Sequence, residues 1–171
     1  MAIISSLGKD EISEPAREIY EEFEKDGKKV PEWVRVMAHR PEILKEFFEL
    51  FKSIMGEGKI DKKLKWTIAY TVSETLKCPF CVDVTSKMLK KMGATDEEIE
   101  QTKKMGNLSE REKDVLELVK EVTLKAHICT PELFEKMKKE FSEPEIVEIV
   151  SIIGLFNYIN RFNNTFCILP E

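Results

Sequence analysis

Apolar residues along this chain recur every three or four positions, separated by Lys and Glu, over most of its length. The segment from Ile43 to Ile54 carries apolar side chains at such spacing, and so does the segment from Val115 to Leu124. This is the period of an α-helix with one buried face. No segment alternates apolar and polar residues as a strand does, and no Asn-Gly hairpin occurs. The pattern predicts an all-α protein of about eight helices.

Helix-start signals support this prediction. A hydroxyl residue or a proline stands before acidic residues and an apolar periodic run, which suits the unsatisfied N–H groups of a helix N-terminus. The signals begin at Ser13, Pro31, Pro41, Thr95, Ser109, Thr130 and Ser142. We expect one all-helical domain over residues 1–171, with short turns between the helices.

Composition excludes several functions. The 171 residues carry 27 Lys and Arg against 32 Asp and Glu, for a formal net charge of -5, and the two signs are interleaved. No basic surface for nucleic acid is predicted. The most apolar stretch, 146–156, is too short to span a bilayer, and the N-terminus has no signal-peptide order. We therefore expect a soluble cytoplasmic protein without nucleic-acid or membrane partners.

The chemistry centres on Cys78-Pro79-Phe80-Cys81. Proline suits the first position of a helix, so Cys78 is predicted to be the N-cap and Cys81 the third helical residue. Helix N-terminal N–H groups stabilise a thiolate, which favours Cys78 as the thiol of lower pKa. Two thiols at this spacing can form a disulfide or share a metal, and in the cytosol such a pair is typically redox-active or metal-bound.

The predicted last helix, about 144–166, ends in alternating amides and aromatic residues. Asn157, Asn160, Asn163 and Asn164 lie within two turns of one another. Asparagine is a mediocre helix former, so we expect these side chains to make buried hydrogen bonds. A structural role is favoured over contact with a substrate.

The chain resembles the carboxymuconolactone decarboxylase-like superfamily, and in particular its alkylhydroperoxidase D-like, peroxidase-related proteins. The similarity runs from about Pro31 onward, with a core at about 41–126. It rests on the CxxC pair with Val82-Asp83 and on four further segments: Ala38 to Glu42, Met92 to Ile99, Leu108 to Lys113 and Asn157 to Asn164. The resemblance implies an alkylhydroperoxidase D-like helical bundle that forms homo-oligomers. It also implies that Cys81 is the peroxidatic thiol and Cys78 the resolving thiol.

Two positions depart from the family pattern. The glutamate and histidine of the family's proton relay correspond to Trp66 and Thr85 here, and neither side chain is a base near neutral pH. A weakened activity is therefore expected. Glu74, four residues before Cys78, is the candidate replacement base, although an ordinary solvent-facing carboxylate is the simpler interpretation.

We predict a CxxC thiol-disulfide oxidoreductase of peroxiredoxin type, with Cys81, Cys78 and Glu74 as catalytic residues and no cofactor or metal. A hydroperoxide or a disulfide would be the substrate, and an unknown thiol the reductant.

The main alternative is a catalytically diverged, oligomeric ligand-binding or interaction protein, whose pocket Trp66 would make more apolar. A Cys3His zinc site of Cys78, Cys81, His127 and Cys129 is a further alternative. Without such a site, Cys129 and Cys167 would be buried apolar residues. Lactone decarboxylation fits poorly, because it relies on acid-base residues.

Overall fold

Helices account for all the regular secondary structure in the described part of the chain. The computed structural model describes residues 2–25, 27–106, 108–125 and 131–170. A short 3-10 turn, Lys9–Glu11, precedes nine α-helices in these ranges. They are α1 (Glu14–Lys25), α2 (Glu32–Met37), α3 (Pro41–Met55), α4 (Lys62–Leu76), α5 (Pro79–Lys91), α6 (Asp96–Lys104), α7 (Glu110–Lys125), α8 (Pro131–Glu140) and α9 (Glu143–Thr165). The predicted all-α class is confirmed, with one helix more than the eight expected.

Most predicted helix starts are observed where capping chemistry places them. Thr95 and Ser142 form capping boxes with Glu98 and Glu145 at the starts of α6 and α9. Ser109 makes the same reciprocal bonds with Glu112 before α7. Side chains that satisfy the first free N–H groups fix where each helix begins. The signal at Thr130 lies outside the described residues, but α8 begins at the next residue.

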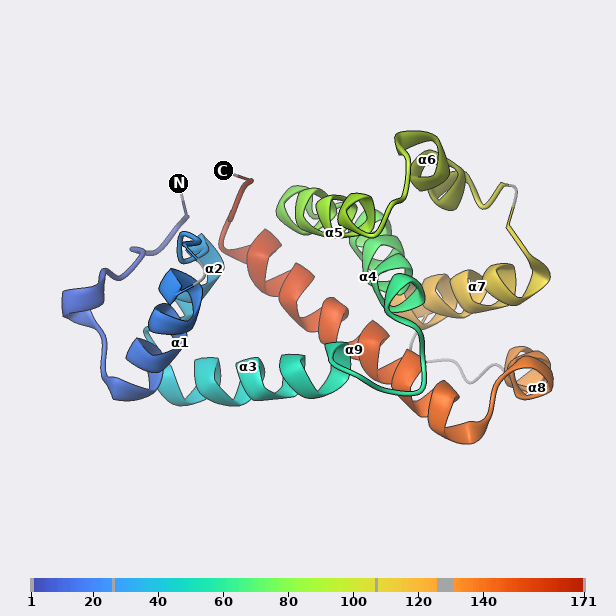
Figure 1. The fold of residues 1–171 in the computed structure, drawn as a ribbon, viewed down its shortest axis with the longest axis horizontal. Helices are drawn as coiled ribbons and strands as arrows, with labels where there is room; N and C mark the ends of the chain where they lie inside the picture. Colours follow the sequence, from blue (N-terminus) through green and yellow to red (C-terminus); the bar gives the residue numbers. More distant parts are fainter. Residues whose placement is uncertain (1, 26, 107, 126–130, 171) are drawn as a thin grey trace.

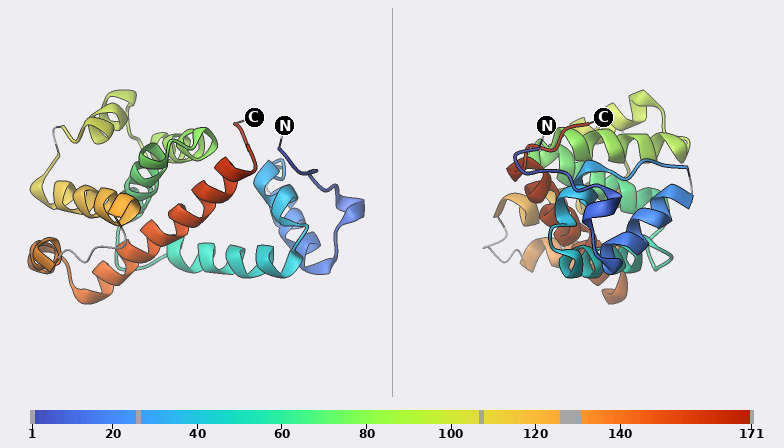
Figure 2. Two further views of the ribbon diagram at one scale, coloured as in Figure 1. Left: turned by 180° about the vertical axis from the view of Figure 1, so that it is seen from behind. Right: turned by 90° about the vertical axis from the view of Figure 1, so that its left-hand side faces the viewer.

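The long helix α9 crosses the molecule and separates two groups of helices, with α1 to α3 on one side and α4 to α8 on the other (Figure 1). The left view of Figure 2 shows the same division from behind. Helix α4 packs most extensively against α9 and α5, and its buried residues occur on every face of the helix. A helix buried all round forms the centre of a domain core. The core therefore lies around α4 and α9.

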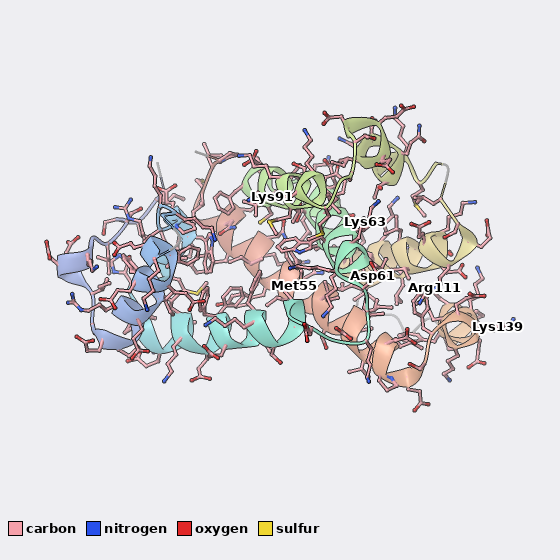
Figure 3. The ribbon with its side chains drawn as sticks, in the orientation of Figure 1. Met55, Asp61, Lys63, Lys91, Arg111 and Lys139 are labelled. Carbon is pink, nitrogen blue, oxygen red and sulfur yellow. The ribbon has the colours of Figure 1, made fainter. Side chains whose placement is uncertain are left out.

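The connection from α3 to α4 runs from Met55, the last residue of α3, to Asp61, and Lys63 lies in the first turn of α4; all three residues are labelled in Figure 3. The Asp61 side chain accepts a hydrogen bond of 2.9 Å from Leu64 N and caps α4. At the other end, α4 stops at Lys77, whose φ of 52° is left-handed. This reversal leads the chain directly into Cys78 and α5.

The N-terminal segment is held against the end of α9. Ile3 N donates to Phe166 O at 2.9 Å, and Leu7 N donates to Arg35 O at 3.2 Å. Tyr20 in α1 donates to Leu7 O at 3.0 Å. These bonds attach α1 and α2 to the rest of the molecule. None of the helices in the described ranges combines the length and hydrophobicity that a membrane crossing requires.

Candidate active site around Cys78 and Cys81

The two cysteines of the CxxC segment lie together at the start of α5, as the sequence predicts. Cys78 is the N-cap, with Pro79 as the first helical residue, and both thiols are free and buried. The Cys81 thiol acts on Cys78 as a hydrogen-bond donor, whereas the Cys78 side chain accepts no helix-capping bond from the backbone. Cys78 nevertheless lies at a helix N-terminus, where the helix dipole favours a thiolate.

These contacts give the two thiols opposite acidities. The hydrogen bond from Cys81 lowers the pKa of Cys78 to about 7, although burial opposes the shift. The pKa of Cys81 is raised above its usual range, because its thiol donates to Cys78 and lies in a buried place beside that charge. The prediction that Cys78 is the more acidic thiol is supported. Near neutral pH the pair therefore shares one proton, held mainly by Cys81.

Cys81, not Cys78, lines a cavity of about 210 Å³. The wall is almost entirely aromatic and aliphatic and comes from helices far apart in sequence. It consists of Phe23, Pro31, Trp33, Phe47, Phe48, Phe51, Trp66, Phe80, Cys81, Val84, Thr85, Phe156, Ile159 and Asn163. No charged side chain stands among these described residues. Reactants in the cavity would meet the Cys81 sulfur in apolar surroundings.

The residues at the two relay positions are part of this wall. Trp66 is 7% exposed and packs edge-on against Phe156, with ring centroids 6.1 Å apart. Its Nε1 donor is buried without a partner in the described structure. Thr85 is fully buried, and its hydroxyl donates to Cys81 O at 2.7 Å, one turn back along α5. Neither side chain supplies a base, and Trp66 makes the cavity apolar, as the sequence indicated.

Glu74 is engaged elsewhere in the described structure. Its carboxylate accepts a hydrogen bond from Tyr70 at 3.3 Å and lies 3.1 Å from the Lys103 ammonium. It is not among the residues that line the Cys81 cavity. Its suggested role as a base stays a prediction. The simpler interpretation was a solvent-facing carboxylate, and the structure shows a helix carboxylate that is 22% exposed and paired with a lysine of α6.

The asparagines of α9 make side-chain hydrogen bonds, and the expectation that these are buried holds for Asn160 and Asn163 but not for Asn164, whose bond is exposed. Asn157 donates to Thr123 at 3.1 Å, Asn160 to Ser73 at 3.3 Å, and Asn164 to Leu76 O at 3.1 Å. These bonds tie α9 to α7 and to α4. Asn163 differs, because its Nδ2 donates to the Cys81 sulfur at 3.2 Å. Helical spacing identified the cluster, but the partner of each amide depends on tertiary packing.

Other candidate residues have simpler places in the structure. Asp83 pairs with Lys87 at 2.6 Å on the surface of α5. The expectation that Cys167 is buried is wrong, because this residue follows the end of α9 in a left-handed turn, φ 54°, and is exposed. His127 and Cys129, the other members of the zinc alternative, lie outside the described residues. In the described residues, no three His, Cys, Asp or Glu side chains gather as metal ligands would.

Comparisons with known proteins agree with this description. Residues 41–121 match the model of the Carboxymuconolactone decarboxylase family. The uncharacterized protein YdfG of Bacillus subtilis strain 168 is 28% identical over 127 residues, which cover 72% of this chain and 86% of that protein. Two crystal structures each match 99% of this chain and 92% of their own at 20% identity. One is the alkylhydroperoxidase AhpD core of a peroxidase-related protein from Ralstonia eutropha JMP134, with a TM-score of 0.89. The other is the debrominase Bmp8, with a TM-score of 0.84.

The fold is therefore an all-α bundle of the alkylhydroperoxidase D type. Residues 41–121 are similar to the Carboxymuconolactone decarboxylase family, and the fold of the whole chain is similar to that of an alkylhydroperoxidase AhpD core, which supports a carboxymuconolactone decarboxylase-like, alkylhydroperoxidase D-like superfamily. This confirms the resemblance on which the sequence-based prediction rested.

Proposed function

We propose that this protein is a dithiol oxidoreductase that reduces apolar organic hydroperoxides with Cys78 and Cys81. One observation carries the proposal: two free thiols share a hydrogen bond at a helix N-terminus, and one of them lines an apolar cavity. A thiolate is the form that attacks peroxides, and a second thiol beside it converts the sulfenic acid into a disulfide.

The pair itself supplies the proton acceptor that Trp66 and Thr85 do not. Cys78 is the more acidic thiol, so it is the thiolate in the resting pair. Transfer of the Cys81 proton to Cys78 leaves a thiolate on Cys81, at the cavity wall. The two thiols thus have separate roles, with Cys78 as base and Cys81 as nucleophile.

The reaction then balances without a cofactor. The Cys81 thiolate attacks the terminal oxygen of the hydroperoxide, the O–O bond breaks, and Cys81 becomes a sulfenic acid while the alkoxide leaves. Cys78 gives its proton to the alkoxide, which departs as the alcohol. The Cys78 thiolate attacks the Cys81 sulfur, the S–OH bond breaks as the disulfide forms, and the departing hydroxide takes up one proton from the buffer and leaves as water. An external thiol, oxidised in turn, must reduce the disulfide by exchange.

The size and lining of the cavity indicate the substrate. An apolar cavity of about 150 Å³ holds a benzene molecule, so the 210 Å³ here admits a substituted ring. Burial of a Phe-sized group contributes about 1.5–3 kcal/mol, or tenfold or more in apparent affinity. A hydroperoxide with an aromatic or similar apolar group should therefore react faster than hydrogen peroxide.

A panel of oxidants tests this proposal. Loss of free thiol is followed in the fully reduced protein after mixing with equimolar cumene hydroperoxide, tert-butyl hydroperoxide or hydrogen peroxide. We expect one disulfide per chain and rates that fall in that order, with cumene hydroperoxide at least about tenfold faster than hydrogen peroxide. A Cys167→Ser variant, which removes an exposed thiol, should behave as the parent does. Thiols that persist with every peroxide would favour the ligand-binding alternative.

Reductive dehalogenation is a second candidate for the same site. The aromatic cavity suits a flat ring, and a cysteine-to-alanine variant of the debrominase Bmp8, which shares the fold, was crystallised with 2,3,4-tribromopyrrole. Here the dithiol would supply two electrons: an aryl bromide and two thiols give the arene, a disulfide and hydrogen bromide. Bromide release from 2,3,4-tribromopyrrole, with matching disulfide formation and no oxidation by hydroperoxides, would favour this reaction.

A further inference from the structure

Asn163 touches the sulfur that lines the cavity, although it lies 82 residues further along the chain. It is completely buried, and its Nδ2 donates to Cys81 Sγ at 3.2 Å. This bond acts against the effects that raise the pKa of Cys81. An amide N–H that points at sulfur is worth more once the sulfur is charged, because a hydrogen bond to an ion is stronger than one to a neutral group.

The other polar atom of the same side chain is free. Asn163 Oδ1 is buried and has no hydrogen-bond partner in the described structure. Asn163 also lines the cavity, so this acceptor lies beside the space where a substrate would bind. A buried acceptor left unpaired costs about 1–3 kcal/mol. Such groups are uncommon in folded proteins and require an explanation.

Asn160 provides the comparison on the same helix. It is equally buried, and its Oδ1 likewise has no partner in the described structure, but its Nδ2 is bonded to Ser73 Oγ and to Phe156 O, and it does not line the cavity. Its amide ties α9 to α4. In the described structure, Asn163 combines a bond to the Cys81 sulfur with a place in the cavity wall, and the wall carries no charged group that could do the same work.

We propose that Asn163 is a catalytic residue that makes Cys81 the attacking thiol and aligns the substrate, an inference that rests on the proposed function. Nδ2–H stabilises the negative charge that reaches Cys81 when its proton moves to Cys78. Oδ1 accepts a hydrogen bond from the O–H of the hydroperoxide and holds the terminal oxygen beside the sulfur. That oxygen keeps its hydrogen when it is transferred, so the same bond persists in the sulfenic acid.

Titration of the thiol tests, without any oxidant, whether Asn163 stabilises the Cys81 thiolate. The measurement uses a Cys78→Ser/Cys129→Ser/Cys167→Ser background, which leaves Cys81 as the one cysteine, and follows ultraviolet thiolate absorbance against pH. The pH dependence of alkylation of the Cys81 peptide is the site-specific check. Asn163→Leu keeps the shape of the side chain and removes both polar atoms. We expect the pKa of Cys81 to rise by about one unit or more, because a bond to an ion is lost. Asn160→Leu, the matched control, should leave this pKa unchanged.

Asn163→Asp distinguishes the role of the amide N–H donor from that of the oxygen acceptor. It also serves as a second probe if the leucine variant folds poorly. It retains an acceptor but replaces the donor with a negative group, so the pKa of Cys81 should rise further. Cys78 is the other titratable group that contacts Cys81 in the described structure, and its removal in the background leaves a single transition. An unchanged Cys81 pKa in both folded Asn163 variants would overturn the inference.

Oxidation kinetics test the second role, alignment of the substrate, in the chain that retains both active-site thiols. Asn163→Leu should slow cumene hydroperoxide reduction by about 10²-fold, the usual effect of removing one group that stabilises reacting charge. Asn160→Leu should change the rate far less. Equal effects of the two variants would overturn the role of Asn163. Failure of the parent protein to react with any hydroperoxide would instead overturn the proposed function, while the titration would still report on the Asn163 contact.

Discussion

At the scale of single residues, Cys78 and Cys81 differ in role because they occupy different positions in the first turn of α5. Cys78 stands at the N-cap of α5, where the Cys81 thiol and nearby backbone N–H groups lower its pKa to about 7. Cys81 stands inside the helix, keeps its proton and lines the cavity. The lower pKa of Cys78 was expected from its place at a helix N-terminus, but its largest cause is the neighbouring Cys81 thiol. The contact of Cys81 with Asn163 was not expected, since it joins segments that only the fold brings together.

The pKa of Cys78 predicts a pH dependence. A lowered pKa means that the thiolate is present above about pH 7 and is lost as the pH falls through that value. The rate of thiol oxidation by cumene hydroperoxide should therefore fall about tenfold per pH unit below this midpoint and level off above it. In Cys78→Ser the midpoint should move to higher pH, because Cys81 loses its proton acceptor. A midpoint that is the same in both proteins would contradict the assignment of Cys78 as base.

At the scale of helices, a buried ion pair fixes α4 against α9. Lys65 is 1% exposed and donates to Ile54 O at 2.7 Å, to Gly56 O at 2.8 Å and to the Glu148 carboxylate. Burial alone would raise the pKa of Glu148. The bonds from Lys65 and from the N–H groups of Lys59 and Ile60 instead hold this pKa below its ordinary value of 4.5. The pair therefore stabilises the helices that carry the site.

Removal of one partner should be costly. Lys65→Met should reduce the free energy of unfolding by about 3–5 kcal/mol, because it leaves a carboxylate and two carbonyl groups without their cation. Urea denaturation at pH 7 measures this change. The contribution of Glu148 exists above its unfolded pKa near 4.5 and disappears as the pH falls through the lower folded pKa. The destabilisation should therefore shrink in acid; a loss that is constant from pH 7 to pH 3 would contradict this account.

Helix starts were the most predictable elements, for a physical reason. Ser142, Thr95 and Ser109 interact with acidic residues three positions further on, so the information is local. The expectation for Cys167 was wrong because an apolar neighbourhood in sequence does not decide which way a residue points after a helix ends.

At the scale of the whole molecule, the cavity joins the matched residues 41–121 to segments that lie before and after them in the chain. Phe23 comes from α1, Pro31 from the turn before α2 and Trp33 from α2, while Asn163 comes from α9. No local pattern could show that these segments meet, because their distances depend on how α1 to α3 pack beside α9. The predicted homo-oligomer stays a prediction, which sedimentation equilibrium can test: a mass of one chain would contradict it.

Trp33 is expected to limit substrate size. Its indole packs edge-on against Phe47, with ring centroids 5.6 Å apart, and forms part of the cavity wall contributed by α2. Trp33→Ala should enlarge the cavity and raise the rate with a hydroperoxide of two fused rings relative to cumene hydroperoxide, by about tenfold. Trp33→Phe keeps a ring and should preserve the parental ratio. A ratio that is the same in all three proteins would place substrate selection elsewhere.

The central claim is that Cys78 and Cys81 form one redox couple, and site-resolved mass spectrometry tests it most directly. The reduced protein receives one equivalent of cumene hydroperoxide, remaining thiols are alkylated, and the peptides are mapped. The account predicts a Cys78–Cys81 disulfide, with Cys167 still alkylated, and a trappable sulfenic acid on Cys81 in Cys78→Ser. Two thiols that stay reduced, or a sulfenic acid found on Cys78 in Cys81→Ser but never on Cys81 in Cys78→Ser, would contradict it.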